Sequence, residues 1–239
     1  MVKFKKFSAL LIFSMVCFQA LAQTQDSYEY NSEFTWGVNK NTFAGLIGGF
    51  VFKKGRKLSD RVLETYGLEI INVKHPQEVR RTSGSGNQFI FGKSNYLYAL
   101  RTQYGRDIIL FKKAPQQGAE IKAVFAAGPT IGVIAPYYVQ LKSGGDVPVF
   151  KQYDSSISIS DIDGSGRLFQ GITDSKIKLG LNAKAAINFE LGTVKSQVTG
   201  FEAGFLIDAY SGPVELMPNA KKYSVFPTLF IAVFYGSRK

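Results

Sequence analysis

The feature that most constrains this fold is the alternation of apolar and polar residues in "KIKLGLNAKAAINFEL", residues 176–191. One face carries Ile177, Leu179, Leu181, Ala183, Ala185, Ile187 and Phe189. The other carries Lys176, Lys178, Gly180, Asn182, Lys184, Ala186, Asn188 and Glu190. An α-helix would scatter these side chains around its axis, so a period of two held over about fifteen residues predicts a long β-strand.

Similar alternation in 118–127 and 200–210 extends the pattern to a whole sheet. Eight strands are expected at 32–39, 43–54, 62–74, 95–104, 118–140, 176–191, 197–210 and 223–235, with a kink in the fifth at Gly128-Pro129 and the first turn near "NKNT". The connections after the second, fourth and sixth strands ("GRKLSD", "KKAPQQ", "GTVKSQ") are short, and those after the third, fifth and seventh are longer. Such asymmetry is typical of a bacterial outer-membrane barrel with both termini in the periplasm, and an even strand count leaves no open edge in lipid.

Alternation alone also fits a soluble β-sandwich, so the choice of solvent needs further observations. The expected strands run to about ten residues or more, whereas strands of soluble proteins average about five or six. Aromatic residues gather near strand ends in "NYLY", "APYYV", "KKYSVF" and "VFYG", where interfacial girdles occur. The sequence therefore predicts an all-β, antiparallel up-and-down transmembrane β-barrel of about eight strands in the outer membrane. A soluble periplasmic β-protein is the alternative.

The polar strand faces are expected to point into the barrel. On this interpretation Lys176, Lys178 and Lys184 are interior charges paired with Glu120, Glu202 and Asp208. A pore is not expected, because eight strands enclose little more than their own side chains.

The first 22 residues have the pattern of a signal peptide. Three lysines precede the apolar run "SALLIFSMVCF", and "ALA" ends at Ala22, so cleavage there leaves residues 23–239 as the outer-membrane β-barrel domain. Cys17, the single cysteine, lies in the segment removed. The remaining chain then has no disulfide, no thiolate metal site and no cysteine nucleophile.

The chain is basic, with a formal net charge of +11, or +8 without the three lysines of the signal peptide. An exported protein rarely meets nucleic acid, so none is expected as a partner. Anionic outer-membrane lipid and lipopolysaccharide phosphates are the expected counter-charges.

One stretch, "SDIDGSGRLFQGITD" at 160–174, has part of the pattern of a calcium-binding EF-hand loop. Asp161, Asp163 and Ser165 fall on ligand positions 1, 3 and 5, but position 12 is Ile172 instead of the required Glu, and a strand pattern follows. A weak calcium site stays open as an alternative. The preferred interpretation is a loop in which Asp and Gly serve turn geometry, with no metal and no cofactor.

An enzyme would have to use His75, the only histidine. A hydrolase that modifies envelope lipid would pair it with Ser83 or Ser85 and with Glu78. Hydroxyls and acids are common in loops, so a protein without catalytic activity is preferred and the enzyme stays the alternative.

Four segments carry a resemblance to a known group. They are "SNYLYALRTQYGRDIIL", "GAEIKAVFAAGPTIGVIAPYY", "KLGLNAKAAINFELG" and "GFEAGFLIDAYSGPVELM". Together they resemble small outer-membrane β-barrel proteins of Bacteroidota, some of which are accessory subunits of barrel-assembly or type IX secretion complexes. The resemblance implies an outer-membrane location and a protein partner in an envelope complex. One departure is that "GSRK" follows Phe234 and Tyr235, where many barrels end on an aromatic residue.

The long 142–175 region is the expected place for contact with that partner. Loops beyond about 12–15 residues are usually functional or disordered. Its first half, "SGGDVPVFKQYDSSISISD", is too apolar for a disordered tether. We therefore expect it to pack as a cap against the barrel mouth or a neighbouring protein.

Overall fold

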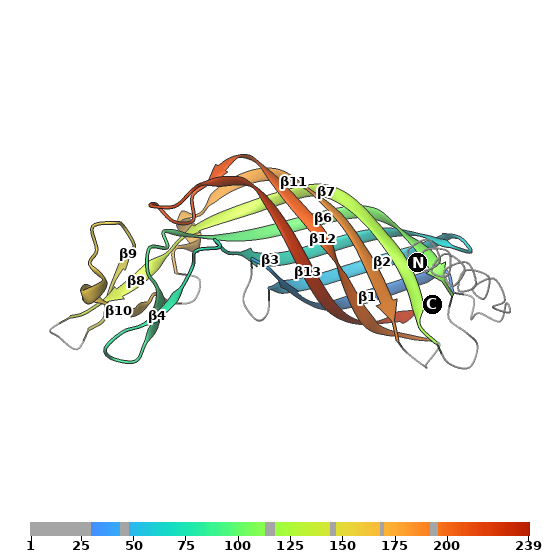
Figure 1. Cartoon of the computed structure of the whole chain (residues 1–239), viewed down its shortest axis with the longest axis horizontal. Coiled ribbons are helices and arrows are strands. Elements are labelled where there is room, and N and C mark those ends of the chain that lie inside the picture. Colours follow the sequence, from blue (N-terminus) through green and yellow to red (C-terminus); the bar gives the residue numbers. More distant parts are fainter. Residues whose placement is uncertain (1–29, 44–47, 113–117, 144–146, 168–169, 192–195) are drawn as a thin grey trace, which may run out of the picture.

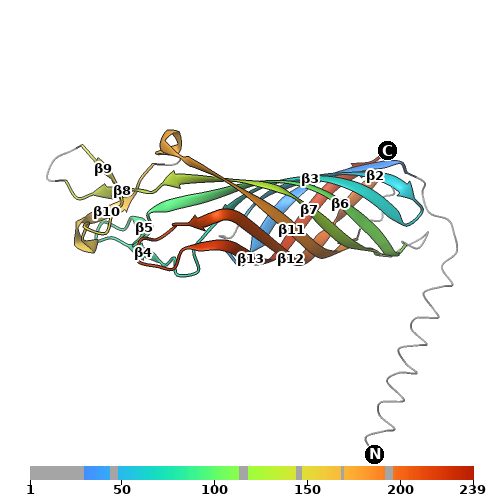
Figure 2. The same cartoon turned by 90° about the horizontal axis from the view of Figure 1, so that it is seen from above.

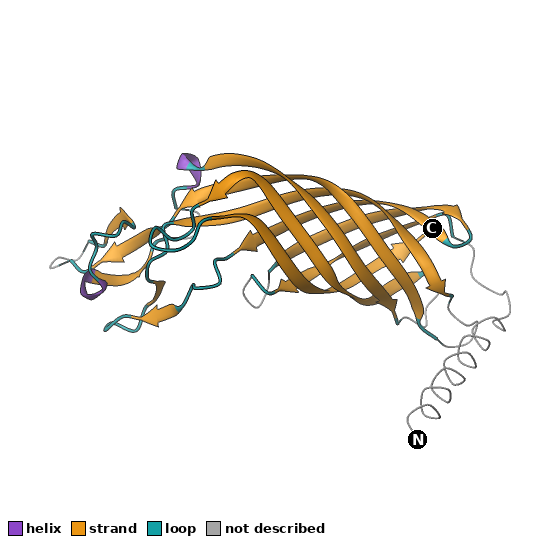
Figure 3. Ribbon diagram, turned by 45° about the horizontal axis from the view of Figure 1, so that its top comes forward, coloured by secondary structure: helices purple, strands orange, loops and turns teal. Residues whose placement is uncertain are grey.

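The computed structural model describes residues 30–43, 48–112, 118–143, 147–167, 170–191 and 196–239. Eight antiparallel strands form a closed barrel in which each strand pairs with the next barrel strand in the chain and the last pairs with the first (Figures 1 and 3). They are β1 (Ser32–Asn41), β2 (Gly49–Ser59), β3 (Val62–Val73), β6 (Asn95–Phe111), β7 (Glu120–Pro136), β11 (Lys176–Glu190), β12 (Gln197–Val214) and β13 (Tyr223–Arg238). The predicted up-and-down barrel is confirmed. The expected signal peptide, 1–22, lies outside the described residues.

The strand pairing fixes the stagger of the barrel. Hydrogen-bonded partners can be followed once around the wall through Asn31, Lys57, Leu63, Asp107, Val124, Ala186, Gly204, Phe230 and Asn41. The path starts at Asn31 and returns ten residues further along the chain, at Asn41. A staggered barrel has strands that are tilted from its axis, typically by roughly 35–45°. Figure 3 shows the strands running obliquely to the long axis of the barrel.

Several expected boundaries were wrong, among them the first turn, the connection after the second strand and the ends of the fourth and fifth strands, of which the fourth runs to Phe111 instead of 104. The first turn is not at "NKNT", because β1 continues to Asn41, which pairs with Phe230 of β13. Most of "GRKLSD" is strand, since β2 pairs with β3 as far as Ser59 and leaves only 60–61 as the turn. β7 runs through Gly128-Pro129 in unbroken register with β11 and ends at Pro136.

The two faces of the wall have opposite chemistry. Ile177, Leu179 and Leu181 of β11 point outward and are 71%, 63% and 67% exposed. On the same strand Asn182 and Lys184 point inward and are buried. The other barrel strands alternate likewise and expose, among others, Phe34, Trp36, Phe50, Ile70, Phe125, Phe205 and Leu229. A water-soluble protein buries its large apolar side chains, so this wall is built to face lipid. None of the helices within the described ranges has the length and apolar character needed to cross a membrane.

Two of the long connections fold together beyond one end of the barrel (Figures 1 and 2). The connection between β3 and β6 holds the hairpin β4 (Arg80–Thr82) and β5 (Gln88–Ile90). The connection between β7 and β11 holds a sheet in the order β10-β8-β9, made of β8 (Tyr138–Leu141), β9 (Val149–Gln152) and β10 (Ile162–Ser165), and the 3-10 turns Ile159–Asp161 and Ile172–Asp174. We call these two connections the lobe.

The lobe has its own apolar core. Its buried members are Phe89, Tyr137, Val139, Tyr153, Ile157 and Ile162. The backbone N–H of Ile90 donates to the Tyr137 hydroxyl at 3.0 Å, which joins the hairpin to the sheet. The 142–175 region is thus packed, as expected, but against the β4–β5 hairpin.

Candidate functional site

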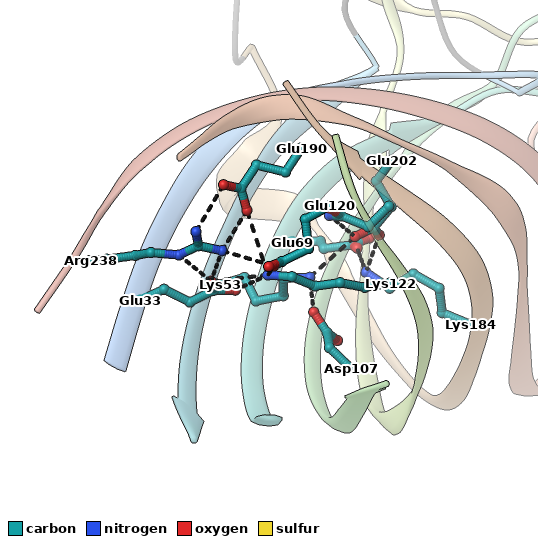
Figure 4. Close-up of polar contacts among 11 residues, drawn as sticks. Glu33, Lys53, Glu69, Asp107, Glu120, Lys122, Lys184, Glu190, Glu202 and Arg238 are labelled. Carbon is teal, nitrogen blue, oxygen red and sulfur yellow. Dashed lines mark hydrogen bonds and ion pairs between the residues drawn. The ribbon is translucent and has the colours of Figure 1, made fainter. Parts of the chain in front are cut away.

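The barrel interior is filled by charged side chains from all eight strands. Its cations are Lys53, Arg101, Lys122, Lys184 and Arg238, and its carboxylates are Glu33, Glu69, Asp107, Glu120, Glu190, Glu202 and Asp208. Most are less than a tenth exposed, and Figure 4 shows how those other than Arg101 and Asp208 meet across the interior. Buried charges are tolerated only where they are paired and hydrogen-bonded, so this network decides whether the barrel can close.

The part of the network nearest the chain ends is centred on Arg238 of β13. Its Nη2 lies 3.2, 3.0 and 2.5 Å from carboxylate oxygens of Glu33, Glu120 and Glu190. Lys122 of β7 contacts the same three groups, Glu33 at 3.0 Å, Glu120 at 3.2 Å and Glu190 at 3.8 Å. The cluster therefore links β1 and β13, where the barrel closes, to β7 and β11 on the far side.

A second chain of ion pairs continues toward the lobe. Lys53 binds Asp107 at 2.7 Å and Glu202 at 3.2 Å. Lys184 also binds Glu202, and joins it to Glu69, with both distances 3.1 Å.

Arg101 completes this chain near the centre of the barrel. Its Nη1 donates to Glu69 at 3.0 Å. With Asp208 it forms a bidentate ion pair, in which Nε and Nη2 lie 3.0 and 2.5 Å from the two carboxylate oxygens. Each carboxylate of the chain is bound by at least one cation, which offsets the cost of burying it.

The interior end below the lobe is apolar. Ile71, Val73, Leu97, Ala99, Tyr210, Val214, Leu216 and Phe226 pack together there. Nearer the other end, a cavity of about 20 Å³ lies between Thr35, Lys53, Lys184 and Glu202. That volume holds about one water molecule. The described interior is therefore filled largely by its own buried side chains.

The predicted interior pairs are right for one lysine and wrong for two. Lys184 binds Glu202 as expected. Lys178 instead donates to the backbone oxygen of Pro213 at 2.6 Å, and Lys176 is exposed at the lobe end of β11. Their expected partners are held by other cations, Glu120 by Lys122 and Arg238, and Asp208 by Arg101.

His75 is buried in a structural role at the end of β3. Its Nδ1 accepts the backbone N–H of Gln77, so Nε2 carries the proton and donates to the backbone oxygen of Lys221 at 3.2 Å. The Glu78 carboxylate binds the His75 backbone N–H and the Lys93 ammonium. Both ring nitrogens thus bind backbone groups, which leaves neither for a serine.

The two candidate serines lie elsewhere. Ser83 and Ser85 bond to each other at 2.8 Å in the β4–β5 turn, and Ser85 donates to Asp163 at 2.5 Å. The His-Ser-Glu arrangement that the alternative, a hydrolase, would require is not formed by these residues. Lys93 belongs to the cluster around His75 and Glu78. Burial lowers the pKa of the Lys93 ammonium, and the ion pair with Glu78 opposes that shift.

The calcium candidates lie in the lobe. Asp163 of β10 accepts hydrogen bonds from Ser85 and, at 3.2 Å, from Gln140, so its carboxylate ties the hairpin to the sheet. Asp161 ends a 3-10 turn and Ser165 ends β10, and both are exposed. Within the described ranges, no group of three or more His, Cys, Asp or Glu side chains is placed to hold a metal ion.

Comparisons with known proteins give structural similarity at very low sequence identity. No family model and no curated protein matches the chain. The structure is similar to Ail, the attachment invasion locus protein of Yersinia pestis, with 11% identity, 89% of this chain and 100% of that chain covered, and a TM-score of 0.40. It is also similar to Neisserial surface protein A, with 9% identity, 90% of this chain and 100% of that chain covered, and a TM-score of 0.39. Another similar structure is the N-terminal β-barrel domain of Pseudomonas aeruginosa OprF, with 10% identity, 86% of this chain and 98% of that chain covered, and a TM-score of 0.33. With TM-scores below 0.5, these similarities carry no conclusion about this chain, and its fold assignment rests on its own strand pairing.

Proposed function

We propose that this protein is an integral outer-membrane β-barrel without catalytic activity, which serves as a structural or accessory subunit of an envelope complex. The observation that carries the proposal is the inverted wall, apolar outside and charged inside. A soluble periplasmic β-protein would have to leave Ile177, Leu179 and Leu181 in water. Lipid and lipopolysaccharide are the proposed surroundings of the wall.

The proposed orientation is supported by the lengths of the loops at the two ends of the barrel. The start of β1 and the end of β13 meet at one end of the barrel, where Ser32 N–H donates to Lys239 O at 2.9 Å. The two-residue turn at 60–61 lies at that end and the lobe lies at the other. We therefore infer that both termini are periplasmic and that the lobe is extracellular, with residues 1–22 acting as a signal peptide.

Because the interior is packed, we infer that the protein binds its partner through the surface of the lobe. Its surface exposes Val147 and Val149 by 74% and 49%, next to the charged β9 residue Lys151. An apolar patch held by an ordered sheet is a common place for protein contact. The partner is proposed to be a protein of the same membrane. The resemblance to Bacteroidota barrels suggests an assembly or type IX secretion complex.

The membrane part of the proposal predicts heat-modifiable migration. Full-length protein expressed with its leader should fractionate with outer membranes, and the unheated sample should migrate faster in a detergent gel than the boiled one, because a closed barrel resists detergent. Recovery in the soluble periplasmic fraction would rule out the membrane barrel.

The lobe part predicts loss of a partner without loss of the barrel. The double variant Val147→Asp/Val149→Asp should reduce co-purification of a membrane protein in mild detergent by about tenfold, since two charges would enter an apolar contact. Val79→Asp, on the chain leading to the β4–β5 hairpin and 62% exposed, is the matched control and should keep the partner. Full co-purification with the double variant would move the contact to another surface.

A further inference from the structure

The outward wall of β2, β3 and β6 carries a charged group near the terminal end of the barrel. Arg56, Glu64 and Arg106 are direct cross-strand neighbours on the three strands. In the next row toward the lobe, Lys54 is followed by Tyr66 and then Tyr104. We call Lys54, Arg56, Glu64, Tyr104 and Arg106 the basic wall site.

The site has an internal scaffold. Glu64 Oε1 accepts the Tyr104 hydroxyl at 2.7 Å and Arg106 Nη1 at 3.3 Å, and the Arg106 guanidinium lies 4.9 Å from the Tyr104 ring centre. The described hydrogen bonds of Arg106, to Glu64 and to the Gly105 carbonyl, both start at Nη1. Since a guanidinium has five N–H donors, most remain for an external acceptor.

The site has more positive charge than its surroundings balance. Lys54 and Arg56 are exposed, and neither forms a hydrogen bond or ion pair with another residue of the described chain. Asp60, the acid of the turn below, pairs with Lys57 at 3.2 Å. Three cations therefore face one carboxylate.

The opposite wall at the same end is apolar. There β11 and β12 present Phe189 and Phe201, whose rings stack at 4.8 Å. Among the outward strand positions that the structure describes near this end, β2, β3 and β6 thus carry the charged group and β11 and β12 carry the aromatic pair. Lysine and arginine on a lipid-facing wall are least costly where their long stems can reach head-group phosphates.

We propose that the basic wall site binds the phosphate of an anionic phospholipid in the periplasmic leaflet. Arg56 and Arg106 offer planar donors for two phosphate oxygens and Lys54 adds a third charge. The rings of Tyr66 and Tyr104, tilted to each other with centres 5.3 Å apart, and the neighbouring Leu68 on the lobe side offer a surface to the acyl chains. This inference rests on the proposed outer-membrane orientation and adds a named lipid class to it.

Native mass spectrometry of the full-length protein in mild detergent tests the inference with phosphatidylglycerol, phosphatidylethanolamine and lipid A as probes. The wild type should bind phosphatidylglycerol more tightly than phosphatidylethanolamine. Arg56→Gln/Arg106→Gln should weaken phosphatidylglycerol binding by about tenfold, through the loss of two charge-assisted contacts, and leave lipid A binding unchanged. The control Lys40→Gln/Lys176→Gln removes the same charge from exposed positions near the lobe ends of β1 and β11 and should bind like the wild type.

The milder variant Arg56→Lys/Arg106→Lys keeps the charge and loses the planar donors, so it should show an intermediate loss even if the glutamine variant fails to fold. If either of these double variants folds and binds phosphatidylglycerol like the wild type, the proposed site is wrong. The site would also be overturned if equimolar glycerol 3-phosphate competed fully with phosphatidylglycerol. The same holds if a crosslinker placed at position 54 captured a protein in place of lipid. Loss of lipid A binding instead would show inverted orientation. Heat-modifiable migration, read on the same samples, reports separately on the barrel.

Discussion

Replacing Arg238 by Met is expected to lower the free energy of unfolding by about 3–5 kcal/mol, the usual cost of removing one partner from a buried ion pair. The variant would leave Lys122 as the one cation within salt-bridge distance of Glu33, Glu120 and Glu190 among the described residues. Arg238 also lies on β13, whose pairing with β1 closes the barrel. The loss of charge balance and the weaker pairing of β13 with β1 would both lower the free energy of unfolding.

The measurement is urea unfolding of the refolded barrel in lipid vesicles, followed by the fluorescence of Trp36, the only tryptophan, which points outward into the apolar belt. Lys239→Met is the matched control, since it removes the same charge from the adjacent, exposed side chain. The double variant Arg238→Met/Glu190→Gln should recover part of the loss, because it also removes one of the three carboxylates that Arg238 contacts. Equal unfolding midpoints for the two methionine variants would mean that the cluster contributes nothing to stability.

The strands and their faces were predictable from the sequence because they depend on local periodicity. Period two in 176–191 separated Ala183 from Asn182 correctly. The partners across the interior were not predictable, because they depend on the ten-residue stagger, which appears only when the sheet closes. Arg101 was missed for this reason: the residues just before it, Ala99 and Leu100, are apolar, and its partner Asp208 is three barrel strands away.

The lobe was predictable only as a packed apolar segment. Its strands are three or four residues long, too short for periodicity to identify. Its core joins Phe89 to Tyr137 and Ile162, which are far apart in the chain. The "DID" pattern at 161–163, which suggested calcium ligands, lies at the start of β10. Its Asp163 accepts hydrogen bonds from Ser85 and Gln140.

The structure also changes which substitution can test the lipid-facing wall. From sequence alone, Asn182→Arg would be a tolerated interior control for Ala183→Arg. Asn182 is instead buried and bonded through its side chain to Gln103 at 2.9 Å and to the Gly128 carbonyl at 3.0 Å. An arginine there would overfill the interior and break these bonds, so a control must come from the outer face.

Ala183→Arg is expected to destabilise the barrel by about 2–4 kcal/mol, because it places a charge near the middle of the lipid-facing wall. Ala183 is midway along β11, between Ala127 and Ile207 on the neighbouring strands. The matched control is Ile177→Arg, on the same face of the same strand beside Lys176 and Lys178, where the cost should be about 0–1 kcal/mol. Unfolding in vesicles gives both values, and the folded fraction in outer membranes should fall for the first variant alone. If the two arginines cost the same, the wall has no depth-dependent apolar environment, and the protein does not span a bilayer.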